Sequence, residues 1–252
     1  MRIWNAGSLA ISLLAALILP TAVQAQVTVV FGTSWDGTAN SLQKIVDARY
    51  GAGAIHVTTD YIGHNAGQPD PFAWTDMRFD AMIVREVAGN ANANVIGWYK
   101  EAGSIPAIDG IDDGIVFNGI DGAGATKFVS FSTPIKFGFY MNPNGPGNAT
   151  NAPEPEKFYT NRKFNDLGPS GGAAIHAPFD GDVQALVFDI SNVVHSPNTW
   201  LVAFEDLDSG ANPGSCCTTD NDFNDLIFEV HAIGTTESRL TSLGRIKAMY
   251  RN

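Results

Sequence analysis

The sequence predicts a mainly β protein: an antiparallel β-sandwich, jelly-roll-like, with one short helix near the mature N-terminus. Three observations predict this class. Short segments rich in β-branched and aromatic residues recur along the chain, and Gly, Asn, Asp and Pro separate them at the spacing typical of a sandwich. Helical periodicity is convincing in one segment before the C-terminus. The length of 252 residues suits one such domain preceded by a leader.

The N-terminal residues predict export. Arg2 is followed by an apolar run, residues 8–19, which is too short to span a bilayer as a helix. Val23–Ala25 then resembles a small-residue cleavage site. We therefore expect a signal peptide over residues 1–25 and a mature chain that starts at Gln26. The protein is expected to be secreted, either extracellular, on the cell surface or in the periplasm, with no membrane span in the mature chain.

The elements of the mature chain can be predicted in order. Gln26–Phe31 is apolar and β-branched, which predicts a strand. Leu42–Tyr50 follows Ser41, a favourable N-cap, and its apolar spacing predicts a helix. Met82–Val87 and Val95–Tyr99 predict two strands, and the turn-forming residues between them predict a hairpin. Further strands are predicted over Ile115–Asn118, Lys127–Phe131, Ile135–Tyr140, Ala185–Ile190, Trp200–Phe204 and Leu226–Val230.

One domain over residues 26–235 is the favoured organisation. Residues 141–155 are rich in Asn, Pro and Gly, which is typical of a long surface loop or of a linker. We favour a loop, because neither flank has the segments needed to bury a separate core. Residues 236–252 are basic and partly apolar, so they predict either a short amphipathic helix or a loosely ordered tail.

The mature chain is strongly acidic. Without residues 1–25 it holds 14 basic and 26 acidic residues, a net charge of −12. This charge argues against nucleic acid and anionic membranes as partners. The two cysteines, Cys216 and Cys217, are adjacent, so the chain has no disulfide framework, and the pair forms a strained bridge, an intermolecular bridge or two free thiols.

Residues 200–230 carry the strongest functional signal. Side-chain oxygens gather where one predicted strand ends and the next begins. They belong to Glu205, Asp206, Asp208, Asp220, Asp222, Asn224 and Asp225. No Lys or Arg occurs in this region to neutralise the carboxylates, and burying them without partners is unfavourable. Because Ca²⁺ binds about six to eight oxygens of these kinds, we expect these residues to hold Ca²⁺.

Two other interpretations of the acidic residues stay open. They could form a solvated loop, in which Asp and Asn serve turns and strand ends, or two of them could be catalytic carboxylates. Asp220, Asp222 and Asn224 repeat the spacing at the start of an EF-hand loop, but Asp225 stands where that loop needs Gly. Residues 109–121 are a second acidic region that could bind a cation more weakly, although turn formation is favoured there.

The same region carries a family resemblance. Phe204-Glu205-Asp206-Leu207, followed by Asp220-x-Asp222-Phe223-Asn224-Asp225-Leu226, resembles the signature of the domain of unknown function 4114, a family common in secreted bacterial proteins. Phe158–Asn165 resembles another segment of that family, and the specific resemblance covers about residues 130–232. The resemblance implies a β-sandwich with a Ca²⁺ site and implies no known activity. The chain departs from the family in the Cys-containing insert between its two acidic halves.

These observations together predict a secreted, non-enzymatic, Ca²⁺-binding domain with a structural, adhesive or extracellular-matrix role. Its expected partner is an extracellular glycan or a cell-surface component. One alternative is a Ca²⁺-dependent carbohydrate-binding module, which would expose Trp or Tyr beside the acids. Another is a polysaccharide hydrolase, which would place two carboxylates about 5–10 Å apart in a groove. The sequence has no zinc-site, serine-nucleophile or phosphate-loop motif.

Overall fold

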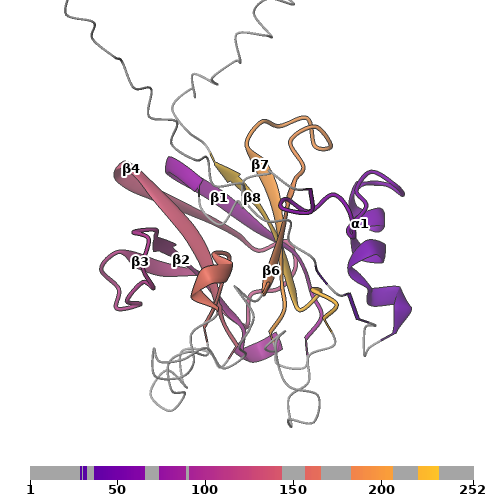
Figure 1. Ribbon diagram of the computed structural model, residues 1–252, viewed down its shortest axis with the longest axis horizontal. Coiled ribbons are helices and arrows are strands. Elements are labelled where there is room, and N and C mark those ends of the chain that lie inside the picture. Colours follow the sequence, from indigo (N-terminus) through magenta and orange to yellow (C-terminus); the bar gives the residue numbers. More distant parts are fainter. Residues whose placement is uncertain are drawn as a thin grey trace, which may run out of the picture.

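The protein is mainly β and antiparallel, as the sequence predicts. The computed structural model describes residues 29, 31–32, 37–65, 74–88, 91–143, 157–165, 183–206 and 221–232. Within these residues eight strands form one sheet, and the helix α1 lies beside it (Figure 1). The predicted signal peptide and the basic C-terminal segment lie outside the described residues. No helix in the described part of the chain is both long and apolar enough to cross a membrane.

The strand order in the sheet is β3-β2-β4-β1-β8-β7-β6, and the short strand β5 pairs with β4. The helical elements are the 3-10 helices η1 (Thr38–Asn40), η2 (Ala91–Ala93) and η3 (Arg162–Phe164) and the α-helix α1 (Leu42–Tyr50). The strands are β1 (Trp74–Glu86), β2 (Val95–Lys100), β3 (Asp113–Phe117), β4 (Thr126–Asn142), β5 (Phe158–Tyr159), β6 (Ala185–Asp189), β7 (Thr199–Phe204) and β8 (Leu226–Ala232).

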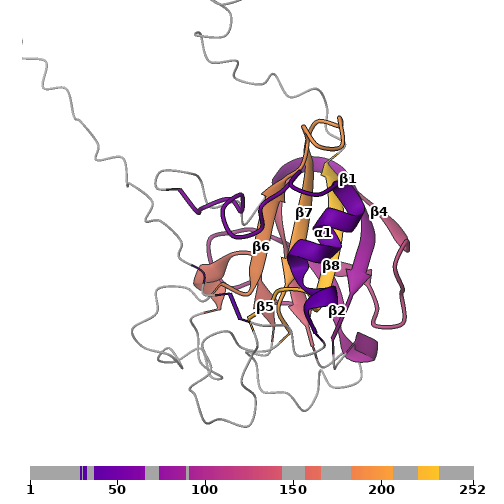
Figure 2. The same cartoon turned by 90° about the vertical axis from the view of Figure 1, so that its right-hand side faces the viewer.

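The helix α1 has the bounds that the sequence predicts. Gly51 ends it with a φ of 99°, and the Gly51 N–H donates to the carbonyl of Asp47. Leu42 and Val46 are buried in a hydrophobic cluster between α1 and the outer face of β6, β7 and β8 (Figure 2). We call this cluster the second core, to distinguish it from the aromatic core inside the curled sheet. A salt bridge of 2.9 Å between Arg49 and Glu229 joins the helix to β8.

The predicted hairpin between residues 82–87 and 95–99 is wrong. β1 pairs with β4 and β8, whereas β2 pairs with β3 and β4. The physical reason is β4, whose 17 residues lie between β1 and β2 in the sheet and pair with both. β1 pairs with the first part of β4, residues 126–137, and β2 with its last part, residues 137–142, so the two strands do not pair with each other.

Two other strand predictions need correction. The strands predicted over residues 127–131 and 135–140 are parts of β4. The predicted break between them corresponds to an irregularity in the pairing of β4 with β1. The four residues between Ser130 and Ile135 lie opposite Met77 alone. The described part of the predicted first strand, Val29 and Phe31, belongs to no strand and instead packs against the second core.

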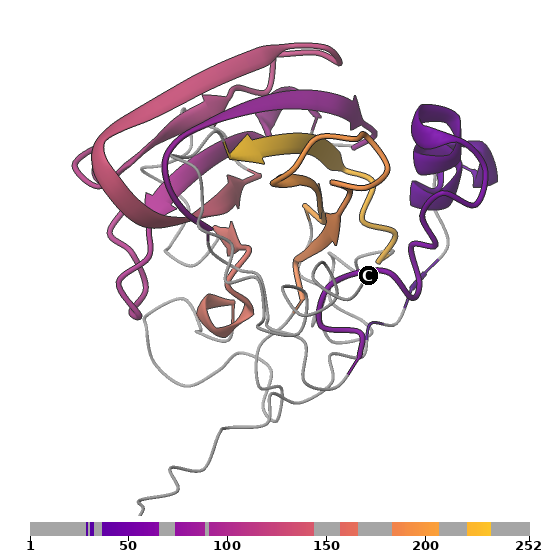
Figure 3. The same ribbon diagram turned by 90° about the horizontal axis from the view of Figure 1, so that it is seen from above.

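The sheet curls around an aromatic core (Figure 3). Three strands separate β3 from β8, which amounts to about 19 Å along a flat sheet. The ring of Phe117 on β3 nevertheless lies 6.0 Å from the ring of Phe228 on β8. The two parts of the sheet therefore face each other across the core, an arrangement consistent with a sandwich.

Candidate metal centre

Four strand ends converge at one end of the curled sheet. Leu226, the first residue of β8, pairs with Glu86 at the end of β1 and with Phe204 at the end of β7. Asn94, which directly precedes β2, donates from Nδ2 to Oδ2 of Asp206 at 3.1 Å. The residues that follow β7 and those that precede β8 therefore lie side by side, as the sequence predicts for its acidic region.

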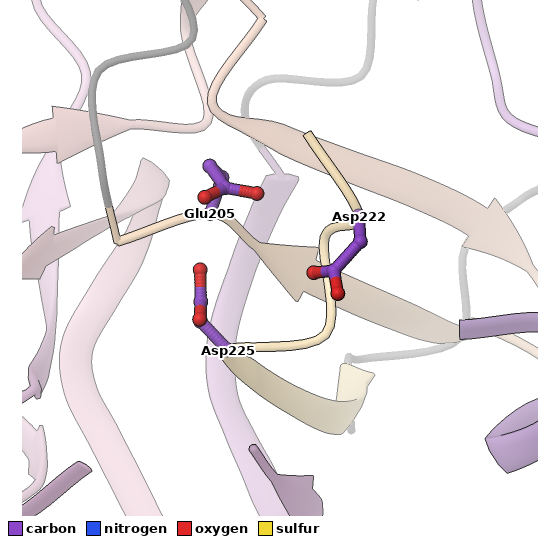
Figure 4. A group of neighbouring side chains, drawn as sticks. All are labelled: Glu205, Asp222 and Asp225. Carbon is purple, nitrogen blue, oxygen red and sulfur yellow. The ribbon is translucent and has the colours of Figure 1, made fainter. Parts of the chain in front are cut away.

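Three carboxylates meet at this point. One oxygen each from Glu205, Asp222 and Asp225 lie within 4.8 Å of one another. Figure 4 shows the three side chains turned toward a shared space, with Glu205 after β7 and the two aspartates before β8. Their residues are 1 %, 5 % and 3 % exposed, so water is largely excluded from them.

The backbone before β8 has an unusual conformation that sorts its side chains. Asn221 and Phe223 have positive φ values of 51° and 55°, which are uncommon for residues other than Gly. Phe223 turns into the second core, where its ring lies 5.8 Å from that of Phe31. Asp222 and Asn224, on either side of Phe223, are both buried at the acidic cluster. The burial of one aromatic ring therefore helps to hold this polar loop.

Hydrogen bonds fix each carboxylate. Asp222 accepts from the Asn224 N–H at 3.1 Å and from the Asn224 side-chain nitrogen at 2.7 Å. Asp225 accepts from the Asp206 N–H at 2.6 Å, and Glu205 accepts from the Phe223 N–H at 3.3 Å. These contacts join the end of β7 to the start of β8, so the three acidic groups are positioned before any ion binds.

The electrostatics of the cluster oppose its own ionisation. Burial, followed by the charges of Glu205, Asp206 and Asp222, raises the pKa of Asp225 well above its usual range. Burial, followed by the charge of Asp206, raises the pKa of Glu86 to about 7. Without a counter-charge, the folded protein therefore favours protonated carboxyl groups at this end of the sheet.

The seven predicted ligands have different outcomes. Glu205, Asp222 and Asp225 form the cluster. Asp206 lies beside it and contacts Asn94. The side-chain nitrogen of Asn224 is bound to Asp222 and to the carbonyl of Asn40, so Asn224 positions Asp222 and could reach an ion only through its oxygen. The two other predicted ligands, Asp208 and Asp220, lie outside the described residues, as do both cysteines.

Two residues of this end of the sheet are missing from the sequence-based set. Glu86 and Asn94 lie more than 100 residues before Asp206 in the chain, at the ends of β1 and β2. The available signal was the position of two oxygen-bearing side chains at the ends of predicted strands. The predicted hairpin concealed it, because it gave both residues an ordinary role beside a turn.

The second acidic region forms turns. Asp113 accepts hydrogen bonds of 2.8 Å from the N–H groups of Asp109 and Gly110. Asp121 accepts one of 2.8 Å from the Asn118 N–H. These are the local side-chain to backbone bonds by which Asp stabilises turns. Turn formation, the interpretation favoured for residues 109–121, agrees with this geometry.

The arrangement has the chemistry of a cation site. Three buried carboxylates around one space could hold a metal ion. Comparison with protein-family models, with curated proteins and with solved structures finds no match for the chain. The resemblance to the domain of unknown function 4114 therefore stays a prediction, and functional inference depends on the geometry of the site.

Proposed function

We propose that the protein is a secreted, non-enzymatic domain whose fold is stabilised by Ca²⁺ and whose role is structural, adhesive or part of an extracellular matrix. One observation carries the proposal: the carboxylates of Glu205, Asp222 and Asp225 are buried and gathered within 4.8 Å. Buried carboxylates repel one another and are poorly solvated, so a bound cation is an effective way to stabilise them in ionised form.

The donor chemistry supports Ca²⁺ over other ions. Each group in the cluster offers carboxylate oxygen, and no His or Cys among the described residues belongs to it. Hard oxygen donors favour Ca²⁺ or Mg²⁺ over Zn²⁺. The ligands come from loops at two strand ends, and such irregular sites suit Ca²⁺, which accepts variable coordination, better than Mg²⁺, which demands an octahedron.

The expected effect of the ion is to link binding to folding. An ion that binds the folded cluster and not the unfolded chain stabilises the fold by about 2.7 kcal/mol at a concentration 100 times its Kd. Glu205 follows β7, while Asp222 and Asp225 precede β8. A shared ion therefore joins these strand ends, and rigid loops at one end of the sheet would present a stable surface to an extracellular partner.

The geometry gives less support to the two alternatives. A glycoside hydrolase needs two carboxylates on opposite sides of a sugar, at least about 5 Å apart, whereas these groups converge and are buried. A carbohydrate-binding surface would expose a Trp or Tyr beside the acids. No Tyr among the described residues is exposed. Trp74, Trp98 and Trp200, the tryptophans in the described residues, instead pack in or against the aromatic core.

Replacement of Asp222 tests the proposed site. Asp222→Asn removes one negative ligand with little change in shape, and the charge of the ligands controls Ca²⁺ affinity. We expect titration calorimetry to show a loss in Ca²⁺ affinity of at least about tenfold. The matched control is Asp112→Asn, because Asp112 is exposed and pairs with Lys100, at the opposite end of β2 from Asn94.

The control variant should bind Ca²⁺ as the unchanged protein does. Equal affinity in the Asp222→Asn variant would remove this residue from the site and contradict the proposal. Absence of any Ca²⁺ binding by the unchanged protein would refute the proposal as a whole.

A further inference from the structure

We infer that a second cation binds next to the first, held by the carboxylates of Glu86 and Asp206 and by the side-chain oxygen of Asn94, which makes the metal centre binuclear. This inference rests on the proposed function, because it adds an ion to the same end of the sheet. Two of its three residues, Glu86 and Asn94, are absent from the sequence-based ligand set. The two ions would adjoin at Asp206 and Asp225, since the Asp206 N–H donates to Asp225.

Asn94 provides the first argument. Its residue is 0 % exposed, and its side-chain nitrogen donates to Asp206. The other end of the same amide, Oδ1, is buried and receives no hydrogen bond within the described residues. A buried carbonyl oxygen without a donor is unfavourable and rare in folded proteins. A cation beside Asp206 would give this oxygen a partner.

Glu86 provides the second argument. Its Oε1 is also buried and receives no hydrogen bond within the described residues. Its neighbour Arg85 does not neutralise it, since Arg85 is exposed and its guanidinium reaches Oδ1 of Asn40 at 3.4 Å. Two oxygens that lack donors therefore come from two separate strand ends near Asp206. The amide nitrogen of Asn94 donates to Asp206, and Glu86 pairs with Leu226, which also pairs with Phe204, two residues before Asp206.

The charge at this end of the sheet provides the third argument. Five carboxylates are gathered there, on Glu86, Glu205, Asp206, Asp222 and Asp225. Their combined charge is −5 when all are ionised, so one divalent ion leaves −3 and two leave −1. Two basic side chains of the described residues, Arg49 and Lys100, form their ion pairs elsewhere, with Glu229 and Asp112.

The number of ions bound per chain tests the inference. Equilibrium dialysis of the purified protein against Ca²⁺ should give two ions for the unchanged protein and one for Glu86→Gln. The matched control is Glu229→Gln. It removes a carboxylate of β8 that binds Arg49 and Tyr50 of α1. That control should keep two ions. Circular dichroism in chelator establishes that each variant is folded.

Asn94→Asp provides a second variant, which should raise the affinity for the second ion. It replaces the amide oxygen with a carboxylate, so the second ion should bind at least about tenfold more tightly, while the number of ions stays at two. If a shared proton rather than a cation occupies the space between Glu86 and Asp206, this variant gains no affinity and binds no second ion.

The failure of this inference is distinguishable from failure of the proposed function. One ion in the unchanged protein, kept by Glu86→Gln and lost by Asp222→Asn, would overturn the second site and leave the first in place. Two ions in Glu86→Gln would equally remove Glu86 from the centre. No bound ion in the unchanged protein would overturn both proposals.

Discussion

Asn224 shows how a single side chain can hold a buried carboxylate in place. Its side-chain nitrogen donates to Asp222 at 2.7 Å and to the carbonyl of Asn40 at 2.9 Å, while its N–H donates to the other oxygen of Asp222. Asp222 is thus held by donors on both of its oxygens. Because Asn40 is the last residue of η1, the same amide joins the loop before β8 to the N-terminal part of the chain.

Replacement of Asn224 by Asp would reverse this interaction. Asn224→Asp removes a donor to a carboxylate and puts a second negative charge beside Asp222. Hydrogen bonds to charged groups contribute about 1.5–3 kcal/mol, so we expect the free energy of unfolding in chelator to fall by roughly that amount. Urea denaturation measures the change.

Asn118→Asp is the control for that substitution, because Asn118 is exposed in a turn and its change should have little effect. Equal stability of the two variants in chelator would show that the Asn224 amide does not position Asp222.

At the scale of elements, α1 covers the outer face of the strands that carry the carboxylate cluster. Leu42 and Val46 pack with Leu201 on β7 and Ile227 on β8 in the second core. Phe223, in the acidic loop, belongs to the same core. The packing of the helix and the position of Asp222 are therefore physically connected through one buried ring.

Truncation of a buried side chain on α1 should weaken both the packing of the helix and the position of Asp222. Leu42 is 2 % exposed, and Leu→Ala changes in such positions cost about 2–5 kcal/mol. We expect Leu42→Ala to lower the free energy of unfolding by that amount in urea denaturation. Lys44→Ala, on the exposed side of the same helix, should change it by less than about 0.5 kcal/mol. A small loss for Leu42→Ala would mean that α1 is not a firm part of the core.

The same elements explain what the sequence could predict. α1 and most strands follow from local patterns, since helical spacing and β-branched segments are readable within ten residues. Glu205, Asp222 and Asp225 were recognisable because they lie next to the ends of two consecutive predicted strands. Pairing of β1 with β8, and with it the place of Glu86, depends on contacts between distant segments, which local patterns do not contain. Asn94 was missed for the same reason.

At the scale of the whole molecule, the acidic balance has a consequence for pH dependence. The pKa of Glu86 is about 7 in the fold, above its usual value near 4.3, and the pKa of Asp225 is raised as well. The folded metal-free protein therefore binds protons more tightly than the unfolded chain. The stability associated with these protons is present below pH 4 and is lost as the pH rises through about 7.

We therefore expect the metal-free protein to lose stability between about pH 4 and pH 7, by roughly 1–2 kcal/mol from Glu86 after allowance for its partial exposure. Ca²⁺ competes with protons for these groups, so its stabilising effect should grow over the same range. Unfolding in chelator and in Ca²⁺ at several pH values measures both. Glu86→Gln should reduce the slope in chelator, and an unchanged slope would contradict the assignment to Glu86.

The central claim, that Ca²⁺ stabilises this fold, is tested most directly by thermal unfolding of the purified protein in excess Ca²⁺ and in chelator at pH 7.5. At a Ca²⁺ concentration about 100 times the Kd, a domain of this size should melt about 5–10 °C higher with Ca²⁺ than without it. A melting temperature that is the same in Ca²⁺ and in chelator would contradict the claim.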